Sequence, residues 1–363
     1  MNKAARLEAA DDTIAGRPPK RRRLAFGLGT SMLLVALIAL GLGLYTHSVR
    51  RAAVAEFMRD VRAAGGEVRV RWSGSYPGRD YQINDMSARL NPAIIRLRKA
   101  GAVDLAVTAL VAEIEADLAK GDNRALMAPI AVLHFLGDGR SDAAVAAYHV
   151  ARSGLWADVR LQAVGLLGHL GEVDREAIRS LGKLLGCTDA EFVKWLLNPV
   201  IFELGILGPM AGDQTPALLA LLRSLDRQSD PQGLRISILR AVSQVGRGTT
   251  ESLPDLLAIL DDSSESLFLR SQALEAISGI AIFIGPKTEL PHAFPKGVIE
   301  GIQRIAEREA DPQLKGQAVQ CLSEVAKREG WGQRMPAGWA PSRRPYSTAV
   351  RKTPSTVTKE YRK

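Results

Sequence analysis

The stretch VRLQAVGLLGHLG, residues 159–171, is the clearest copy of a thirteen-residue pattern that occurs six times in the chain. Positions six, nine and twelve of every copy are aliphatic, and position thirteen is Gly or Ala. Steps of three residues place such side chains on one face of a helix, and a small last residue suits a sharp turn at the helix end. The pattern predicts an amphipathic helix that is repeated along the chain.

The six copies begin at residues 125, 159, 196, 234, 269 and 314, so successive starts lie 34, 37, 38, 35 and 45 residues apart. Every copy but the last is followed by a second helical stretch and a polar link. A period of about 30–50 residues is typical of a solenoid, in which each helix pair buries its apolar face against the next. We therefore expect an all-α solenoid of six to seven helical hairpins over residues 89–330, with a degenerate seventh copy at residues 89–101.

Positions six and nine are expected to supply the core between helix pairs, because each lies in the middle of its helix. The twelve side chains of this repeat core are Ile130, Leu133, Val164, Leu167, Ile201, Leu204, Leu239, Val242, Leu274, Ile277, Val319 and Leu322.

The copy at residues 159–171 resembles the HEAT repeats described as phycobilisome-lyase-like. Asp158, Val159 and Arg160 look like the Asp and Val-Arg that open the first helix in that family, and the Leu-Gly-x-Leu-Gly that follows is also similar. The resemblance covers residues 89–326 and implies a HEAT-like fold, with a polar link at position two of the repeats. It implies no activity, since one such fold hosts many unrelated tasks. The polar-link residues are Asp158, Arg160, Arg235, Arg270 and Lys315, whereas Leu126 and Leu197 depart from the pattern.

Residues 24–45, LAFGLGTSMLLVALIALGLGLY, contain no charged side chain. At about 1.5 Å per residue this segment reaches across a hydrocarbon core of roughly 30 Å. Basic residues flank it on both sides, which favours a single transmembrane helix over a buried soluble one. Basic residues are more frequent just before the segment, in residues 1–23, than in the first twenty residues after it. The positive-inside rule therefore places the N-terminus in the cytoplasm and the solenoid on the other side of the membrane.

Residues 46–88 differ from both the anchor and the repeats. Helical spacing over residues 52–64 is followed by Gly65 and Gly66 and by alternation over residues 67–72, which predicts a helix, a stop and a short strand before a turn-rich linker. This order resembles a juxtamembrane unit of many membrane-anchored planctomycete proteins.

The formal charge of +9 is concentrated at the two ends of the chain. Residues 1–23, a basic N-terminal tail, carry +4 and residues 331–363 carry +7, which leaves −2 for residues 24–330. A nearly neutral solenoid lacks the basic surface that a nucleic-acid duplex requires, so nucleic acid is not an expected partner. Residues 331–363 are rich in Pro, Ser, Thr, Arg and Lys, which predicts disorder. A solvated tail and an adhesive segment for anionic lipid or nucleic acid are both consistent with this composition.

Motifs of catalysis are missing from the sequence, which has no HExxH, GxSxG, GxGxxG, CxxC or P-loop. The two cysteines lie in different repeats, and the five histidines are scattered. We therefore expect no enzyme, no catalytic residue, no metal and no cofactor. The longest spacing reflects an insert at residues 282–295, either a partner loop or an ordinary length variation.

The expected function is that of a single-pass membrane-anchored scaffold for protein–protein interaction, with the partner held by polar residues of the second helices. Two alternatives remain open from the sequence: a nucleic-acid-binding HEAT-like protein, and a non-catalytic subunit of a membrane enzyme complex.

Overall fold

A computed structural model describes residues 28–64, 70–73, 80–83, 86–225, 233–245, 252–283 and 295–328. The chain divides into two compact units, Met1–Ala52 and Ala53–Lys363. The expected basic tail at residues 1–23, the first four residues of the expected transmembrane helix, residues 284–294 of the insert and the expected disordered segment 331–363 lie outside the described residues.

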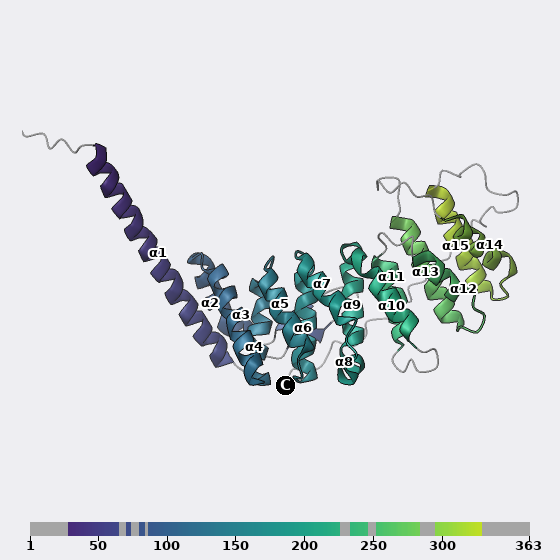
Figure 1. The fold of residues 1–363 in the computed structure, drawn as a ribbon, viewed down its shortest axis with the longest axis horizontal. Coiled ribbons are helices and arrows are strands. Elements are labelled where there is room, and N and C mark those ends of the chain that lie inside the picture. The colour runs from purple at the N-terminus through teal and green to yellow at the C-terminus, as the bar shows by residue number, and fades with distance from the viewer. Residues whose placement is uncertain are drawn as a thin grey trace, which may run out of the picture. The chain divides into compact units, whose positions relative to one another are not determined.

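The first unit consists, in its described part, of the beginning of helix α1, which runs over Leu28–Ala64 (Figure 1). Side chains of α1 between residues 31 and 50 are exposed, including Met32 at 66% and Leu44 at 64%. Within the part of the chain that the structure describes, α1 is the one helix long and apolar enough to cross a membrane. The helix continues without interruption past Tyr45, so the segment 52–64, expected as a helix of its own, is the last part of α1.

The end of α1 belongs to the second unit and is packed there. Phe57, Met58 and Val61 are buried in the same apolar core as α2 (Met86–Lys99) and α3 (Val103–Lys120). The Arg62 guanidinium donates two hydrogen bonds of 2.9 Å to the Glu113 carboxylate of α3. The last turns of α1 therefore cover apolar side chains of the first helix pair, as a terminal repeat of a solenoid must have its open side covered.

Two short strands, β1 (Val70–Ser73) and β2 (Asp80–Ile83), form an antiparallel pair between α1 and α2 in the sequence. The strand expected at residues 67–72 overlaps β1, and its partner β2 was not expected. The β2 sequence, DYQI, is too short and too polar to show a strand pattern by itself.

The other described residues of the second unit are mainly helical, and each of the six sequence copies forms a helix. The first five copies each begin a helix pair, and the sixth is followed by no second helix among the described residues. The first helices are α4 (Asn123–Leu136), α6 (Ala157–Leu170), α9 (Leu197–Leu207), α11 (Leu234–Val245), α13 (Leu267–Phe283) and α15 (Pro312–Arg328). The second helices are α5 (Ser141–Arg152), α7 (Arg175–Leu184), α10 (Thr215–Ser224), α12 (Leu253–Asp261) and α14 (Lys296–Arg308). A short helix α8 (Ala190–Trp195) precedes α9, and a 3₁₀ helix η2 (Gly208–Gln214) follows it.

Helix pairs contact one another in chain order. Each first helix packs on the first helix of the next pair, from α4 through α6, α9, α11 and α13 to α15. Among the second helices, α3 contacts α5, α5 contacts α7, and α12 contacts α14. Figure 1 shows these neighbours side by side, an arrangement compatible with an α-solenoid.

The core of this stack is formed by the sequence pattern. Eleven of the twelve side chains expected in the repeat core are at most 5% exposed, and Val319 is half-buried. The six side chains at position twelve, from Leu136 to Val325, are buried as well. Three positions of each first helix therefore face the interior, consistent with the helical period.

Two glycines at position thirteen, Gly171 and Gly208, are favoured for different reasons. Gly171 has a φ of −60°, which any residue adopts, but a Cβ there would lie 2.8 Å from the Leu207 side chain of the next first helix. Gly208 differs, because its φ of 56° lies in the left-handed region that favours glycine. The sequence predicted a turn at this position, and at Gly171 the reason is the approach of α9.

Replacing Leu167 or Val242 by Ala should destabilise the protein, because both side chains are fully buried at position nine. We expect a loss of about 1–5 kcal/mol in the free energy of unfolding, larger for Leu167→Ala because more volume is removed. Denaturant titration followed by circular dichroism measures it. Leu105→Ala, at a site 40% exposed in α3, is the control and should change the value by less than about 1 kcal/mol. Equal effects at all three sites would contradict the assigned core.

Deleting residues 1–45 should release a helical protein from membranes, because the exposed apolar surface of α1 is removed while its packed end is kept. Deleting residues 1–64 should in addition remove Phe57, Met58 and Val61 and lower the stability by up to about 4–9 kcal/mol. Carbonate extraction and thermal melts compare the two deletions. Retention of the shorter deletion in washed membranes would contradict a single anchor.

Candidate functional site

The polar link expected at position two of the repeats is present around Arg160, a buried cation at the start of α6. Its Nε donates to the carbonyl of Ala151 at the end of α5, at 3.0 Å, and its Nη2 donates to Asp189 Oδ2 at 3.2 Å. Asp189 is the N-cap residue of α8, which opens the next repeat. One guanidinium thus joins three consecutive parts of the stack.

The contact with a carboxylate recurs at Arg235 and Arg270, and the contact with a backbone carbonyl recurs at Arg270. Arg235 donates to both carboxylate oxygens of Glu265, at 2.9 and 2.6 Å. Arg270 donates to the carbonyl of Leu260 at 2.8 Å and to Glu309 at 2.5 Å. In three of the six copies position two therefore holds a buried arginine that bonds an acidic residue ahead of the next first helix, and a buried cation of this kind needs such a partner.

Two members of the expected link behave differently. Lys315 donates to the carbonyl of Glu307 at 3.2 Å but is exposed, and Asp158 is exposed at the start of α6. The carboxylates that pair with the arginines are Asp189, Glu265 and Glu309, about thirty to forty residues further along the chain. Sequence reasoning missed them, although an acidic residue shortly before the next copy was the available signal.

The surroundings of Glu309 favour the ionised form of its carboxyl group. Desolvation opposes ionisation, but the backbone N–H of Asp311 and the Arg270 guanidinium together hold the pKa of Glu309 below its ordinary value. A lowered pKa in the folded state means stability that is present at neutral pH and is lost as the pH falls through that pKa.

Side chains on the second helices are largely engaged with their neighbours. His149 of α5 pairs with Glu115 of α3 at 2.8 Å, and Arg304 of α14 pairs with Asp261 of α12 at 2.9 Å. The Tyr148 ring lies 5.7 Å from both the Arg152 and the Lys183 cation. Exposed pairs of this kind contribute little stability each. Nevertheless, these pairs engage polar side chains of the second helices, the surface on which a partner was expected.

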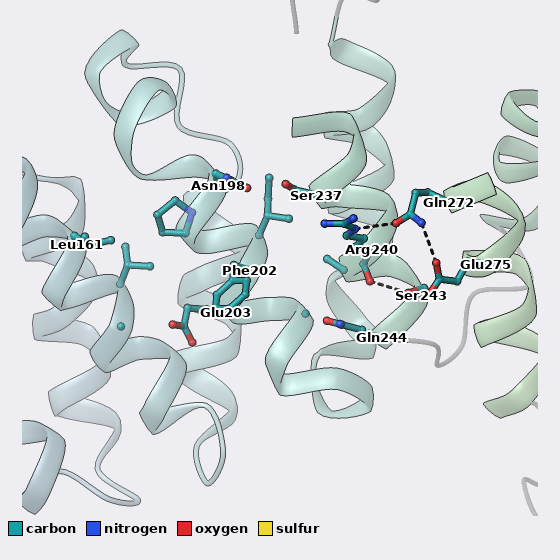
Figure 2. A pocket seen from close by; sticks show the side chains of 16 residues that line it. Leu161, Asn198, Phe202, Glu203, Ser237, Arg240, Ser243, Gln244, Gln272 and Glu275 are labelled. Carbon is teal, nitrogen blue, oxygen red and sulfur yellow. Dashed lines mark hydrogen bonds between the residues drawn. The ribbon is translucent and has the colours of Figure 1, made fainter. Parts of the chain in front are cut away.

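First helices, in contrast, line a groove with a volume of 820 Å³ (Figure 2). Four consecutive first helices contribute to it: α6, α9, α11 and α13. Its lining residues are Leu161, Val164, Gly165, Asn198, Pro199, Ile201, Phe202, Glu203, Gly205, Ser237, Arg240, Ala241, Ser243, Gln244, Gln272 and Glu275.

The groove combines an apolar centre with a polar end. Phe202 of α9 is 50% exposed and supplies apolar surface to the groove. Figure 2 shows Phe202 near the middle of the lining residues. At one end, Arg240 Nε donates to Gln272 Oε1 at 2.9 Å, and Gln272 Nε2 donates to Glu275 Oε2 at 2.9 Å. Apolar contact area with a few oriented polar groups is typical of a binding surface.

The wall between α6 and α9 is built around Glu203, whose side chain is only 2% exposed. A Cβ on Gly168 would lie 1.9 Å from Glu203 Oε2, so only glycine leaves room for this carboxylate at the α6 surface. The glycine in the Leu-Gly-x-Leu-Gly sequence of α6 thus places an acidic group at the edge of the groove.

No group of three His, Cys, Asp or Glu side chains that could hold a metal occurs among the described residues. Burial raises the pKa of the Cys321 thiol to about 12 and keeps it protonated at neutral pH. His134 is buried and stacks on His169 with 5.8 Å between ring centroids, because helices α4 and α6 pack closely there.

Comparisons with known proteins identify no family for the chain. No protein-family model and no curated protein matches the chain. Among solved structures, one engineered protein matches with a TM-score of 0.39 and 17% identity over 68% of this chain and 65% of its own length. A second engineered protein matches with a TM-score of 0.36 and 18% identity over 61% of this chain and 96% of its own. Similarities of this size carry no argument about function.

Replacing Arg270 by Ala should cost about 2–4 kcal/mol of stability, because the Glu309 carboxylate and the Leu260 carbonyl would lose a buried partner. Arg304→Ala is the matched control. Its pair with Asp261 is roughly half exposed and should contribute no more than about 1 kcal/mol. Denaturant titrations at pH 7 measure both, and the difference between Arg270→Ala and wild type should shrink toward acidic pH. Equal losses for both variants would argue against the link.

Proposed function

We propose that this chain is a membrane-anchored scaffold that binds a protein partner through an α-solenoid of HEAT-like repeats. The observation that carries the proposal is the groove on four neighbouring first helices, with the half-exposed Phe202 at its centre. A surface that crosses several repeats suits an extended polypeptide, which can contact one helix after another.

The buried link supports the HEAT-like assignment. In three repeats an arginine at position two of the first helix bonds an acidic residue at the opening of the next repeat. This is the position at which the sequence resembles the HEAT family, and a contact of this kind between neighbours is what a repeat needs to keep its spacing.

The partner would sit on the first helices, and this differs from the sequence-based expectation that the second helices hold it. Polar side chains of the groove such as Asn198 and Ser237 offer both donors and acceptors to a peptide backbone. Ionic contacts between neighbouring second helices leave fewer polar groups for a partner on that face.

Nucleic acid fits the groove less well than protein does. One cation, Arg240, and two carboxylates, Glu203 and Glu275, are among the lining residues. Duplex binding relies on several Lys or Arg contacts with phosphates, which this lining does not supply.

Helix α1 would hold the scaffold at a membrane as a single span. The arrangement of basic residues around residues 24–45 favours a cytoplasmic N-terminus and a solenoid on the opposite side. A continuous helix from the anchor into the first layer would keep the binding surface attached without a separate linker.

Photocrosslinking in membranes tests the proposal. A benzophenone amino acid in place of Phe202 should give covalent adducts with one discrete protein. Phe202→Glu should lower the amount of this protein that co-purifies by a factor of about ten or more. The control carries the crosslinker at Val145, an exposed site of α5 with 40% exposure. Adducts at Val145 but not at residue 202 would contradict the location of the groove.

Salt titration of DNA binding tests the alternative function, nucleic-acid binding. We expect any DNA binding by the full chain to disappear when residues 331–363 are removed and to weaken steeply with salt. Tight binding that survives the removal would overturn the scaffold proposal in favour of a nucleic-acid-binding protein.

A further inference from the structure

We propose that the chain's own C-terminal segment, residues 331–363, binds in the groove of α6, α9, α11 and α13, so that a partner must displace it. The proposal rests on the function proposed above and adds regulation of the same surface by an internal ligand.

Charge complementarity is the first argument. The segment has eight basic residues and one acidic residue. On the first helices, positions seven to twelve of the six copies carry three carboxylates, Glu203, Glu275 and Glu324, and one cation, Arg240. Glu203 is only 2% exposed and Glu324 lies on α15 outside the groove, so the charge that faces a ligand there is the exposed carboxylate of Glu275. Opposite charge favours both encounter and orientation of a basic segment at that carboxylate.

Glu275 is the carboxylate best placed to meet a cation. It is exposed at the polar end of the groove and accepts a hydrogen bond from the uncharged amide of Gln272 at 2.9 Å. Within the described part of the chain no Lys or Arg forms a salt bridge with it. A lysine or arginine from the segment would give this carboxylate a charged partner.

The composition of the segment also fits the apolar part of the groove. It contains two tryptophans and two tyrosines, which can pack on the exposed face of Phe202 and on Leu161. Four prolines are spread through it, at positions 336, 341, 345 and 354. Proline fixes φ near −65° and favours extended chain, the form that can follow a groove across several helices.

Connectivity brings the segment to the groove. It follows α15, which ends at Arg328 and packs on α13, the helix that carries Glu275. Residues 329–363 can span up to roughly 115 Å at about 3.3 Å each. Neighbouring packed helices are about 10 Å apart, so the distance from α15 to α6 is on the order of 40 Å. The segment is long enough to reach every helix of the groove.

Crosslinking of the purified full-length chain in detergent tests the proposal without any partner. With a benzophenone amino acid in place of Phe202, mass spectrometry should identify adducts with residues 331–363 in the same molecule, and their yield should not depend on protein concentration. The same amino acid at Val145 is the control and should give no such adduct.

Charge variants of the crosslinking protein sharpen the test. Glu275→Lys should lower the yield of the adduct at least fivefold, and raising the salt concentration should lower it too because the contact is ionic. Glu300→Lys, an exposed acidic site of α14, is the matched control and should leave the yield unchanged. Replacing Arg343 and Arg344 by Glu should reproduce the loss. Circular dichroism confirms that every variant is folded.

Several results would overturn the proposal. They are the lack of adducts between residue 202 and the segment, a yield unaffected by Glu275→Lys, and a yield that rises with protein concentration, which would assign the groove to a second copy. In membranes, deleting residues 331–363 should increase partner adducts at residue 202. Partner adducts without segment adducts would overturn this inference and leave the scaffold function standing. Segment adducts in the full-length chain, with no partner adducts even after residues 331–363 are deleted, would contradict the scaffold function and with it the regulatory role of the segment.

Discussion

Burial of the aliphatic face of each first helix is the constraint on which the rest of this structure depends. A single amphipathic helix in water cannot bury that face, so every pair needs a neighbour on each side. The side chains at positions six, nine and twelve meet this need by packing between consecutive pairs, and Val319 in the last copy is the one that is half-buried. At the other end, the last turns of α1 bury Phe57 and Val61 and supply the neighbour that the first pair would otherwise lack.

In three repeats, a buried arginine also fixes the spacing between neighbouring helix pairs. Apolar contacts are not directional, whereas a guanidinium bonded to a carbonyl behind it and a carboxylate ahead of it fixes where both must lie. Arg160, Arg235 and Arg270 each make such a bond to the acidic opening of the next repeat, so an irregular number of linker residues can be accommodated while the helices keep their order.

The two layers of helices consequently have different surfaces. Second helices bond across to their neighbours through pairs such as His149–Glu115 and Arg304–Asp261. First helices pack through small residues, with Gly168 and Gly205 allowing Glu203 and Gln244 to approach, and the groove forms on their outer side. The proposed binding of a partner and its proposed control by the basic C-terminal segment both rest on this difference.

The amino-acid sequence by itself determined the helical pairs, the identity of the core positions and the apolar helix near the N-terminus, because these depend on periodicity and on the length of an uncharged run. It also indicated arginine at position two as a polar link. Only the tertiary structure decided which carboxylates complete that link, since Arg270 and Glu309 are 39 residues apart. It alone placed the groove on the first helices, because Leu161, Phe202, Arg240 and Glu275 come from four separate helices and each looks like an ordinary surface residue in its own segment. Adjacency between helices depends on packing over the whole stack, and a local pattern contains no record of it.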